Sequence, residues 1–201
     1  MTILGDRKRE LKSSDYYGTP RWLCKAIFEE FSTACPGVER VCDPAAGDGR
    51  LLEPWVHAGF DFCAFDLEPR RRLSLVIGRV VSLTHLDFFS DEAFEAMRAS
   101  DLIICNPPFS IGEAWFYRLC KIGRPWIMIQ NVLFDTAGGR HGERALRLSG
   151  CARTAVHHKV RFEAKDGTRA QAGLPIAIWS WGLSRAPKFI FRSVDWRREH
   201  G

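Results

Sequence analysis

The first clear pattern along the chain is an apolar stripe at three- and four-residue spacing that follows Thr19 and Pro20. The stripe consists of Leu23, Cys24, Ile27, Phe28 and Phe31. This spacing predicts an amphipathic helix, with Thr19 as its N-cap and Pro20 as its first helical residue. Residues 1–15 are polar and charged, and they predict a flexible N-terminal arm.

Short apolar runs and further helical stretches alternate over the rest of the chain. Strands are expected over residues 40–43, 61–66, 101–105 and 125–131, and within 76–81 and 83–88. Helices are expected around 51–56, after Ser90, over 111–121 and near 143–148, and runs at 175–181 and 188–191 predict a C-terminal antiparallel strand pair. This alternation predicts an α/β fold, with a mostly parallel central sheet and helices on both faces. A ligand is then expected outside the carboxyl ends of the strands.

Composition narrows the class of protein. The 201 residues carry 29 basic against 24 acidic side chains, and the net charge of +5 is compatible with a polyanionic partner. Seven cysteines, an odd number without Cys-x-x-Cys spacing, predict reduced core thiols in a cytoplasmic protein, with no disulfide frame and no metal site. No apolar run is long enough to span a membrane, so no membrane partner is expected.

A small-residue loop over residues 43–49 follows the first expected strand and reads Asp-Pro-Ala-Ala-Gly-Asp-Gly. Gly47 and Gly49 allow a tight turn and a close approach to a ligand, with Asp43 and Ala45 at the start of the loop. The loop has neither a Lys-Ser/Thr pair nor a Gly-x-Gly-x-x-Gly pattern, so it does not resemble a pyrophosphate cradle. An acid without a basic neighbour suits a ligand with a positive amine.

Further acids close the next two expected strands. Asp66, followed by Leu67, can accept both hydroxyls of a ribose. Asp87 can accept an adenine amino group, and Phe88 can stack on the ring. A cationic amine, a ribose and an adenine in that order describe S-adenosylmethionine. Each position also has an ordinary alternative, because the acids can cap turns or strands and Phe88 can be a core ring.

The tetrapeptide Asn106-Pro107-Pro108-Phe109 directly follows the buried strand expected over 101–105. The Asn106 carboxamide and the Pro107 carbonyl can accept the two hydrogens of a planar amine, with Pro108 stiffening the turn. The Phe109 ring can stack on the face of the same group. The alternative is a strand that ends at a Pro-Pro turn.

With these motifs the chain resembles the S-adenosylmethionine-dependent DNA adenine-N6 methyltransferases, which have a Rossmann-like class I methyltransferase fold. The resemblance spans residues 16–192 and rests on the tetrapeptide, the loop over 43–49 and an N-terminal element, Tyr17-Gly18-Thr19-Pro20. In the family, this element touches the methionine end of the cofactor. The resemblance therefore implies S-adenosyl-L-methionine as cofactor and DNA as substrate.

The family also implies a late aromatic segment that stacks an extruded base. Phe162 is the best match, with Arg161 and Lys159 beside it as substrate contacts, although Phe162 can equally be a core residue. Sequence-specific members carry a recognition domain, whereas here 16–201 reads as a single methyltransferase domain with only loops at 134–140 and 163–173 to spare. A short or degenerate target is therefore expected, or recognition through a homodimer or an unidentified partner.

Other substrates stay open at this point. The same tetrapeptide serves RNA adenine methyltransferases and protein glutamine N5-methyltransferases, and a cytosine N4 amine has similar chemistry. RNA is the main rival, because structured or single-stranded RNA exposes bases without full flipping. A non-catalytic binding relic of the fold is a further alternative. Gln130 and Asn131, at the end of the next expected strand, can line the pocket or cap the strand.

Overall fold

The computed structural model describes residues 18–67, 84–134, 150–157, 159–163, 173–185 and 189–190. The N-terminal arm, Tyr17, the apolar run at 76–81 and the helix expected near 143–148 lie outside them, and so does most of the loops expected at 134–140 and 163–173. Within this part of the chain, no helix is long and apolar enough to cross a membrane. All seven cysteines are free thiols, and four of them are buried.

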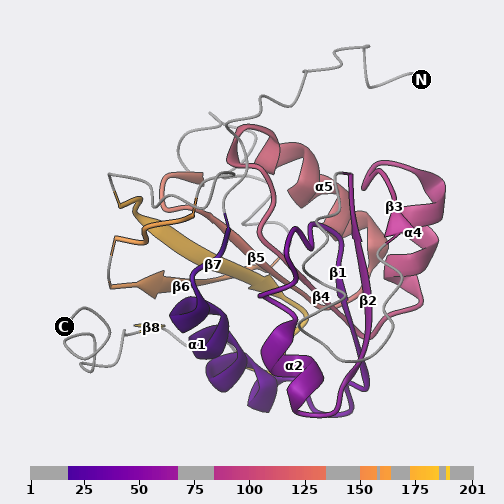
Figure 1. Ribbon diagram of the computed structural model, residues 1–201, viewed down its shortest axis with the longest axis horizontal. Helices are drawn as coiled ribbons and strands as arrows, with labels where there is room; N and C mark the ends of the chain where they lie inside the picture. Colours follow the sequence, from indigo (N-terminus) through magenta and orange to yellow (C-terminus); the bar gives the residue numbers. More distant parts are fainter. Residues whose placement is uncertain are drawn as a thin grey trace.

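The described residues form one eight-stranded sheet, with the strand order β3-β2-β1-β4-β5-β7-β6-β8 (Figure 1). The strands are β1 (Arg40–Asp43), β2 (Asp61–Asp66), β3 (Thr84–His85), β4 (Leu102–Cys105), β5 (Trp126–Asn131), β6 (Ala152–Val156), β7 (Ile176–Trp181) and β8 (Phe189–Ile190). Strands β1 to β5 pair in parallel, whereas β7 runs antiparallel to both β5 and β6. The expected mixed sheet, mostly parallel at its centre, is confirmed.

Helices cover both faces of this sheet, as the alternation of elements predicts (Figure 1). They are α1 (Arg21–Phe31), α2 (Glu53–His57), α4 (Asp91–Arg98) and α5 (Gly112–Ile122), with short 3-10 turns η2 (Ser32–Ala34) and η3 (Phe109–Ile111). Alternate residues of β4 supply two cores, since Leu102 and Ile104 pack with α1 and α2, and Ile103 and Cys105 pack with α4 and α5. Burial on both faces explains why this strand is apolar throughout.

The expected pairing of the last two strands is wrong. The run at 175–181 forms β7 and the run at 188–191 contains β8, but these strands do not pair with each other. Strand β6 lies between them, antiparallel to β7 and parallel to β8. Strand β6 has no clear signature in the sequence, because Arg153 and Thr154 interrupt its apolar character and only Thr154 is fully buried.

The third strand is shorter than expected from the run at 83–88, because β3 ends at His85. Asp87 and Phe88 lie in the turn that follows, where the Asp87 side chain accepts a hydrogen bond from the Phe89 backbone amide at 2.9 Å. Such a local contact favours a turn over a strand. The expected cap of the next helix is confirmed, since the Ser90 hydroxyl accepts from the Ala93 amide at 3.1 Å.

Candidate active site

The carboxyl ends of β2, β1 and β4 lie side by side, and each is followed by a polar residue of interest. Asp43 ends β1 opposite Ala64 of β2, so Asp66 lies two residues further along the neighbouring strand. Asn106 follows β4, which pairs with β1 on its other side. Parallel strands therefore bring all three side chains to one edge of the sheet, where ligands of such folds bind.

The loop after β1 is tied to the ends of both neighbouring strands. Asp43 accepts a hydrogen bond from the Ala45 amide at 2.9 Å, and the Gly47 amide donates to the Asp66 carboxylate at 2.8 Å. Gly47 has a φ of 53° and Gly49 a φ of 81°, so the turn uses the left-handed conformation that glycine adopts most easily. The two glycines are required here for the reason expected from the sequence.

Three carboxylates surround this loop, Asp43 and Asp48 within it and Asp66 at the end of β2, and Arg50 pairs with Asp48. Asp43 is 1% exposed, and its burial raises its pKa well above the ordinary value, with further increases from the nearby charges of Asp66 and Asp48. A cation placed among these groups would favour their ionised forms. The loop therefore fits the sulfonium and the ammonium of S-adenosylmethionine, and it is unsuited to a pyrophosphate.

Thr19 connects the N-terminal element to the tetrapeptide. Helix α1 begins at Arg21, one residue later than expected, and Thr19 does not cap it. The Thr19 hydroxyl instead accepts a hydrogen bond from the Asn106 side-chain amide nitrogen at 3.0 Å, although the two residues are 87 positions apart. Because this contact uses the amino group of the amide, the acceptor oxygen of Asn106 points away from Thr19.

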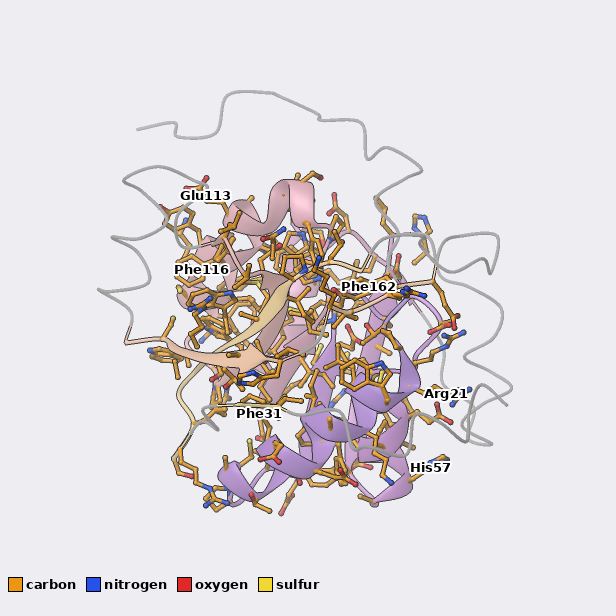
Figure 2. All side chains as sticks on the ribbon, turned by 90° about the vertical axis from the view of Figure 1, so that its left-hand side faces the viewer. Arg21, Phe31, His57, Glu113, Phe116 and Phe162 are labelled. Carbon is orange, nitrogen blue, oxygen red and sulfur yellow. The ribbon has the colours of Figure 1, made fainter. Side chains whose placement is uncertain are left out.

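The aromatic end of the tetrapeptide packs against the late segment. Phe109 and Phe162 meet edge to face, with ring centroids 5.7 Å apart and an interplanar angle of 83°. Phe162 is fully buried and lies in the interior in Figure 2, so it supports Phe109 in this structure. A stacking role for Phe162 on a base stays a prediction. Arg161 and Lys159 alternate with it and are exposed, as substrate contacts require.

The residues expected to contact the adenine differ in exposure. Phe88 is 4% exposed, and one face of its ring stacks on Trp115 with centroids 3.5 Å apart. Asp87 is exposed, and Phe89, the residue after Phe88, carries the ring that reaches the surface here, 42% exposed. Leu67 is also at the surface. Contacts of Asp87, Phe88 and Leu67 with an adenine stay predictions, and Phe89 is a candidate that the sequence analysis missed.

Gln130 and Asn131 can now be assigned to structural roles. Gln130 is 1% exposed and packs against Gly112, where an added Cβ would lie 1.9 Å from its amide nitrogen. Asn131 accepts a hydrogen bond from the Leu133 amide at 2.8 Å and so caps the turn after β5. Gly112 thus allows the start of α5 to approach β5 closely, directly after the tetrapeptide turn.

An ion pair that the sequence does not reveal joins the cofactor loop to the late segment. Arg50 lies 2.5 Å from Glu163 and 2.7 Å from Asp48, measured between the charged nitrogen and oxygen atoms. Arg50 and Glu163 are 113 positions apart, and no pattern in the chain relates them. Backbone hydrogen bonds between Gly18 and Glu163 attach the same segment beside Thr19.

Solved structures with this architecture include methyltransferases of several kinds. A provisionally assigned RNA methyltransferase from Pyrococcus horikoshii superposes with a TM-score of 0.59 at 16% identity, covering 92% of this chain and 94% of the other. A modification subunit, provisionally assigned to a type I restriction enzyme of Vibrio vulnificus, superposes with a TM-score of 0.58 at 15% identity. The match covers 89% of this chain and 46% of that subunit. A provisionally assigned class I S-adenosylmethionine-dependent methyltransferase from Listeria monocytogenes superposes with a TM-score of 0.52 at 12% identity, covering 88% of this chain and 65% of the other.

These likenesses show that the chain has the Rossmann-like fold of the class I methyltransferases. No protein-family model and no curated protein sequence matches the chain. The cofactor implied by this fold is S-adenosylmethionine, and the acidic glycine loop fits it.

Proposed function

We propose that this protein transfers a methyl group from S-adenosylmethionine to the exocyclic N6 amine of adenine in DNA, with a short or degenerate target sequence. The observation that carries this proposal is the Asn106 side chain. Its amide is held by Thr19 at 3.0 Å, and it lies at the end of β4, beside the strand that leads into the acidic loop.

The proposed chemistry depends on holding a weak nucleophile in place. The lone pair of an adenine amine is delocalised into the ring. Hydrogen bonds from its two hydrogens to the Asn106 side-chain oxygen and the Pro107 backbone oxygen draw the nitrogen toward tetrahedral geometry. The freed lone pair then faces the methyl group for in-line displacement, so positioning and electrostatics supply most of the acceleration.

No strong base is needed before the transfer. The bound cofactor supplies a methyl group on a sulfonium sulfur, which is an excellent leaving group because it departs as a neutral thioether. The amine nitrogen becomes acidic once it carries the methyl group, and it then loses a proton to water. Phe109, braced by the buried Phe162, ends the tetrapeptide that Asn106 begins, and its ring stacks on the base.

Exposed basic side chains support a nucleic acid as substrate. Lys159 and Arg161 project from the segment in which the alternating residues, Val160 and Phe162, are fully buried. This alternation holds two cations at the surface beside the tetrapeptide, where they can contact phosphates. In duplex DNA the target base must be flipped out, which costs a few kcal/mol.

RNA adenine is the second candidate. The Pyrococcus horikoshii protein that matches nearly the whole of this chain is provisionally assigned as an RNA methyltransferase. The Vibrio vulnificus modification subunit matches over only 46% of its own length and is named for a restriction system. DNA is favoured here by the resemblance of the N-terminal element, and RNA is the alternative that the experiment has to separate.

The deciding experiment offers DNA and RNA separately with isotopically labelled S-adenosylmethionine, followed by nuclease digestion and mass spectrometry of the nucleosides. Labelled N6-methyldeoxyadenosine, absent from the Asn106→Ala variant, is the expected product. Labelled N6-methyladenosine from RNA alone would replace DNA with RNA as the substrate, and labelled N4-methyldeoxycytidine would replace the target base.

No labelled nucleoside from either polymer, with cofactor binding intact, would contradict the proposal. Protein glutamine amides would then be assayed with the same label. A binding relic without catalysis would show no labelled product of any kind, and a melting temperature that does not rise with S-adenosylmethionine would remove the cofactor as well.

A further inference from the structure

Arg50 is shared between two carboxylates that belong to different parts of the candidate site. Its Nε lies 2.7 Å from Asp48 in the cofactor loop, and its Nη1 lies 2.5 Å from Glu163 at the end of the late segment. The side chains of Arg50 and Asp48 are each only 12% exposed, and that of Glu163 is 30% exposed. Partial burial makes these contacts less screened by solvent than surface ion pairs.

Asp48 lies between the two glycines of the cofactor loop. It stands between Gly47 and Gly49, whose positive φ angles of 53° and 81° are accessible to glycine. The Gly47 amide also donates to Asp66, the acid expected to hold the cofactor ribose. A ligand that binds Asp66 therefore shifts the backbone next to Asp48. Asp48 in turn accepts a hydrogen bond from the Arg50 backbone amide and forms an ion pair with the Arg50 side chain.

Glu163 lies at the other end of this connection. Its backbone pairs with Gly18, next to the Thr19 hydroxyl that holds Asn106. The preceding residues present Arg161 outward and Phe162 inward against Phe109. A shift of Glu163 therefore changes the position of the basic side chains and of the ring that braces the tetrapeptide.

We propose that Arg50 is a positioning residue that couples the two ligands of this site, so that an occupied cofactor loop sets the late segment, residues 159–163, in the position that binds nucleic acid. The inference rests on the proposed function, because it assigns the cofactor to one side of Arg50 and the nucleic acid to the other. Such coupling is reciprocal for binding, so nucleic acid also tightens cofactor binding.

The test measures binding without turnover. The affinity of the full chain for a fluorescein-labelled mixed-sequence DNA duplex, and for an RNA of the same sequence, is measured with and without S-adenosylhomocysteine. In the parent protein this cofactor product tightens binding by about fivefold or more, the lower end of typical couplings. In Glu163→Gln, which removes the charge but keeps the shape, the factor falls below about twofold.

Two further variants test whether the coupling depends on the ion pairs of Arg50 with Asp48 and Glu163. Arg50→Lys keeps the charge but lacks the planar fork that contacts two carboxylates at once, so it reduces the coupling as well. Glu53→Gln is the matched control, because it breaks the neighbouring Arg21–Glu53 ion pair, also 2.5 Å long, without touching the late segment. Figure 2 shows Arg21 at the periphery of the molecule, away from Phe162. Glu53→Gln retains the full coupling factor.

A second readout follows the late segment directly. Hydrogen exchange of the amides at 159–163 slows on addition of S-adenosylhomocysteine to the parent protein and does not slow in Glu163→Gln. A structural role alone would lower the melting temperature of the variant but leave the coupling factor unchanged, and that result would overturn the proposal.

The two proposals fail in different ways. Equal coupling in the parent protein and in Glu163→Gln, or no coupling in the parent protein, overturns the role of Arg50 even if DNA is methylated. Intact coupling without any methylated nucleoside contradicts the proposed reaction and leaves the role of Arg50 standing. No binding of either polymer, with or without S-adenosylhomocysteine, overturns both.

Discussion

The loop over residues 43–49 and the segment over residues 159–163 lie at the same edge of the sheet but have opposite charge. The loop holds Asp43 and Asp48 close to Asp66, and it buries Asp43 almost completely. The segment exposes Lys159 and Arg161 while burying the apolar residues between and beside them. The contrast separates two kinds of ligand, since a buried acidic site favours a cation and an exposed basic surface favours a polyanion.

The neutral tetrapeptide lies between these two regions. Asn106 is held from the N-terminal side by Thr19, and Phe109 is braced from the late segment by Phe162. The side chains of the tetrapeptide are uncharged, so they repel neither a cationic cofactor nor a polyanionic substrate. Each region can therefore be tested by its own substitutions.

The largest effect is expected at the neutral meeting point. Asn106→Ala lowers turnover by more than about tenfold, a loss of at least roughly 1.4 kcal/mol of transition-state stabilisation, because the amine loses an acceptor. Cofactor affinity survives, since the side chain is not part of the acidic loop. Steady-state kinetics with calorimetry measures both quantities.

Asn131→Ala is the matched control for that variant. It removes an asparagine from the end of the adjacent strand β5, where the side chain only caps a turn, and it leaves turnover unchanged. Normal turnover in Asn106→Ala would mean that the tetrapeptide does not hold the reacting amine.

The acidic region is tested by Asp66→Ala. Removing this carboxylate weakens S-adenosylmethionine binding by about tenfold or more, the scale of a hydrogen bond to a charged group, and it also releases the Gly47 amide. Asp61→Ala, at the exposed opposite end of the same strand, is the control and leaves the calorimetric affinity unchanged. Equal affinities in the two variants would contradict the assignment of the ribose site.

The basic region is tested by salt dependence. Replacing Lys159 and Arg161 with Gln weakens DNA binding several-fold and lowers the slope of log affinity against log salt by about 2, one for each lost phosphate contact. The same change at Arg98 and Lys121, in the last turns of α4 and α5 at the opposite edge, leaves the slope unchanged. An unchanged slope in the first variant would remove this segment from the substrate surface.

The smallest effect concerns stability. Burial holds the pKa of Asp43 well above its unfolded value, so the fold loses stability as pH rises from that unfolded value toward the folded one. Asp43→Asn keeps the acceptor for Ala45 but removes this cost, and it raises stability at neutral pH by about 0.5–2 kcal/mol. Denaturant unfolding at mildly acidic and neutral pH measures the change, and the expected gain shrinks in acid.

The same substitution also changes cofactor binding. Cofactor affinity falls in Asp43→Asn because the loop loses a negative charge, so the variant is more stable and less active. If Asp43→Asn is less stable than the parent protein at neutral pH, the Asp43 carboxylate does not destabilise the cofactor-free protein.

Short stretches of the sequence predict much of the fold and the strand ends at which the candidate site lies. Periodicity along β4 and α1, the small residues of the loop over 43–49 and the Pro-Pro turn after Asn106 are properties of short stretches, and their order along the chain predicts which strand ends face the ligand. Gly47 and Gly49 were predictable for the same reason, because a tight turn restricts residue choice locally.

Tertiary structure decided the contacts between distant segments. Thr19 was expected to cap a helix but instead binds Asn106, 87 positions away, and β6 enters the sheet between two strands expected to pair. The Arg50–Glu163 ion pair and the stacking of Phe88 on Trp115 have no local signature. A hydroxyl, a guanidinium or a ring has several possible partners in the sequence, and only the packing of the whole chain selects one of them.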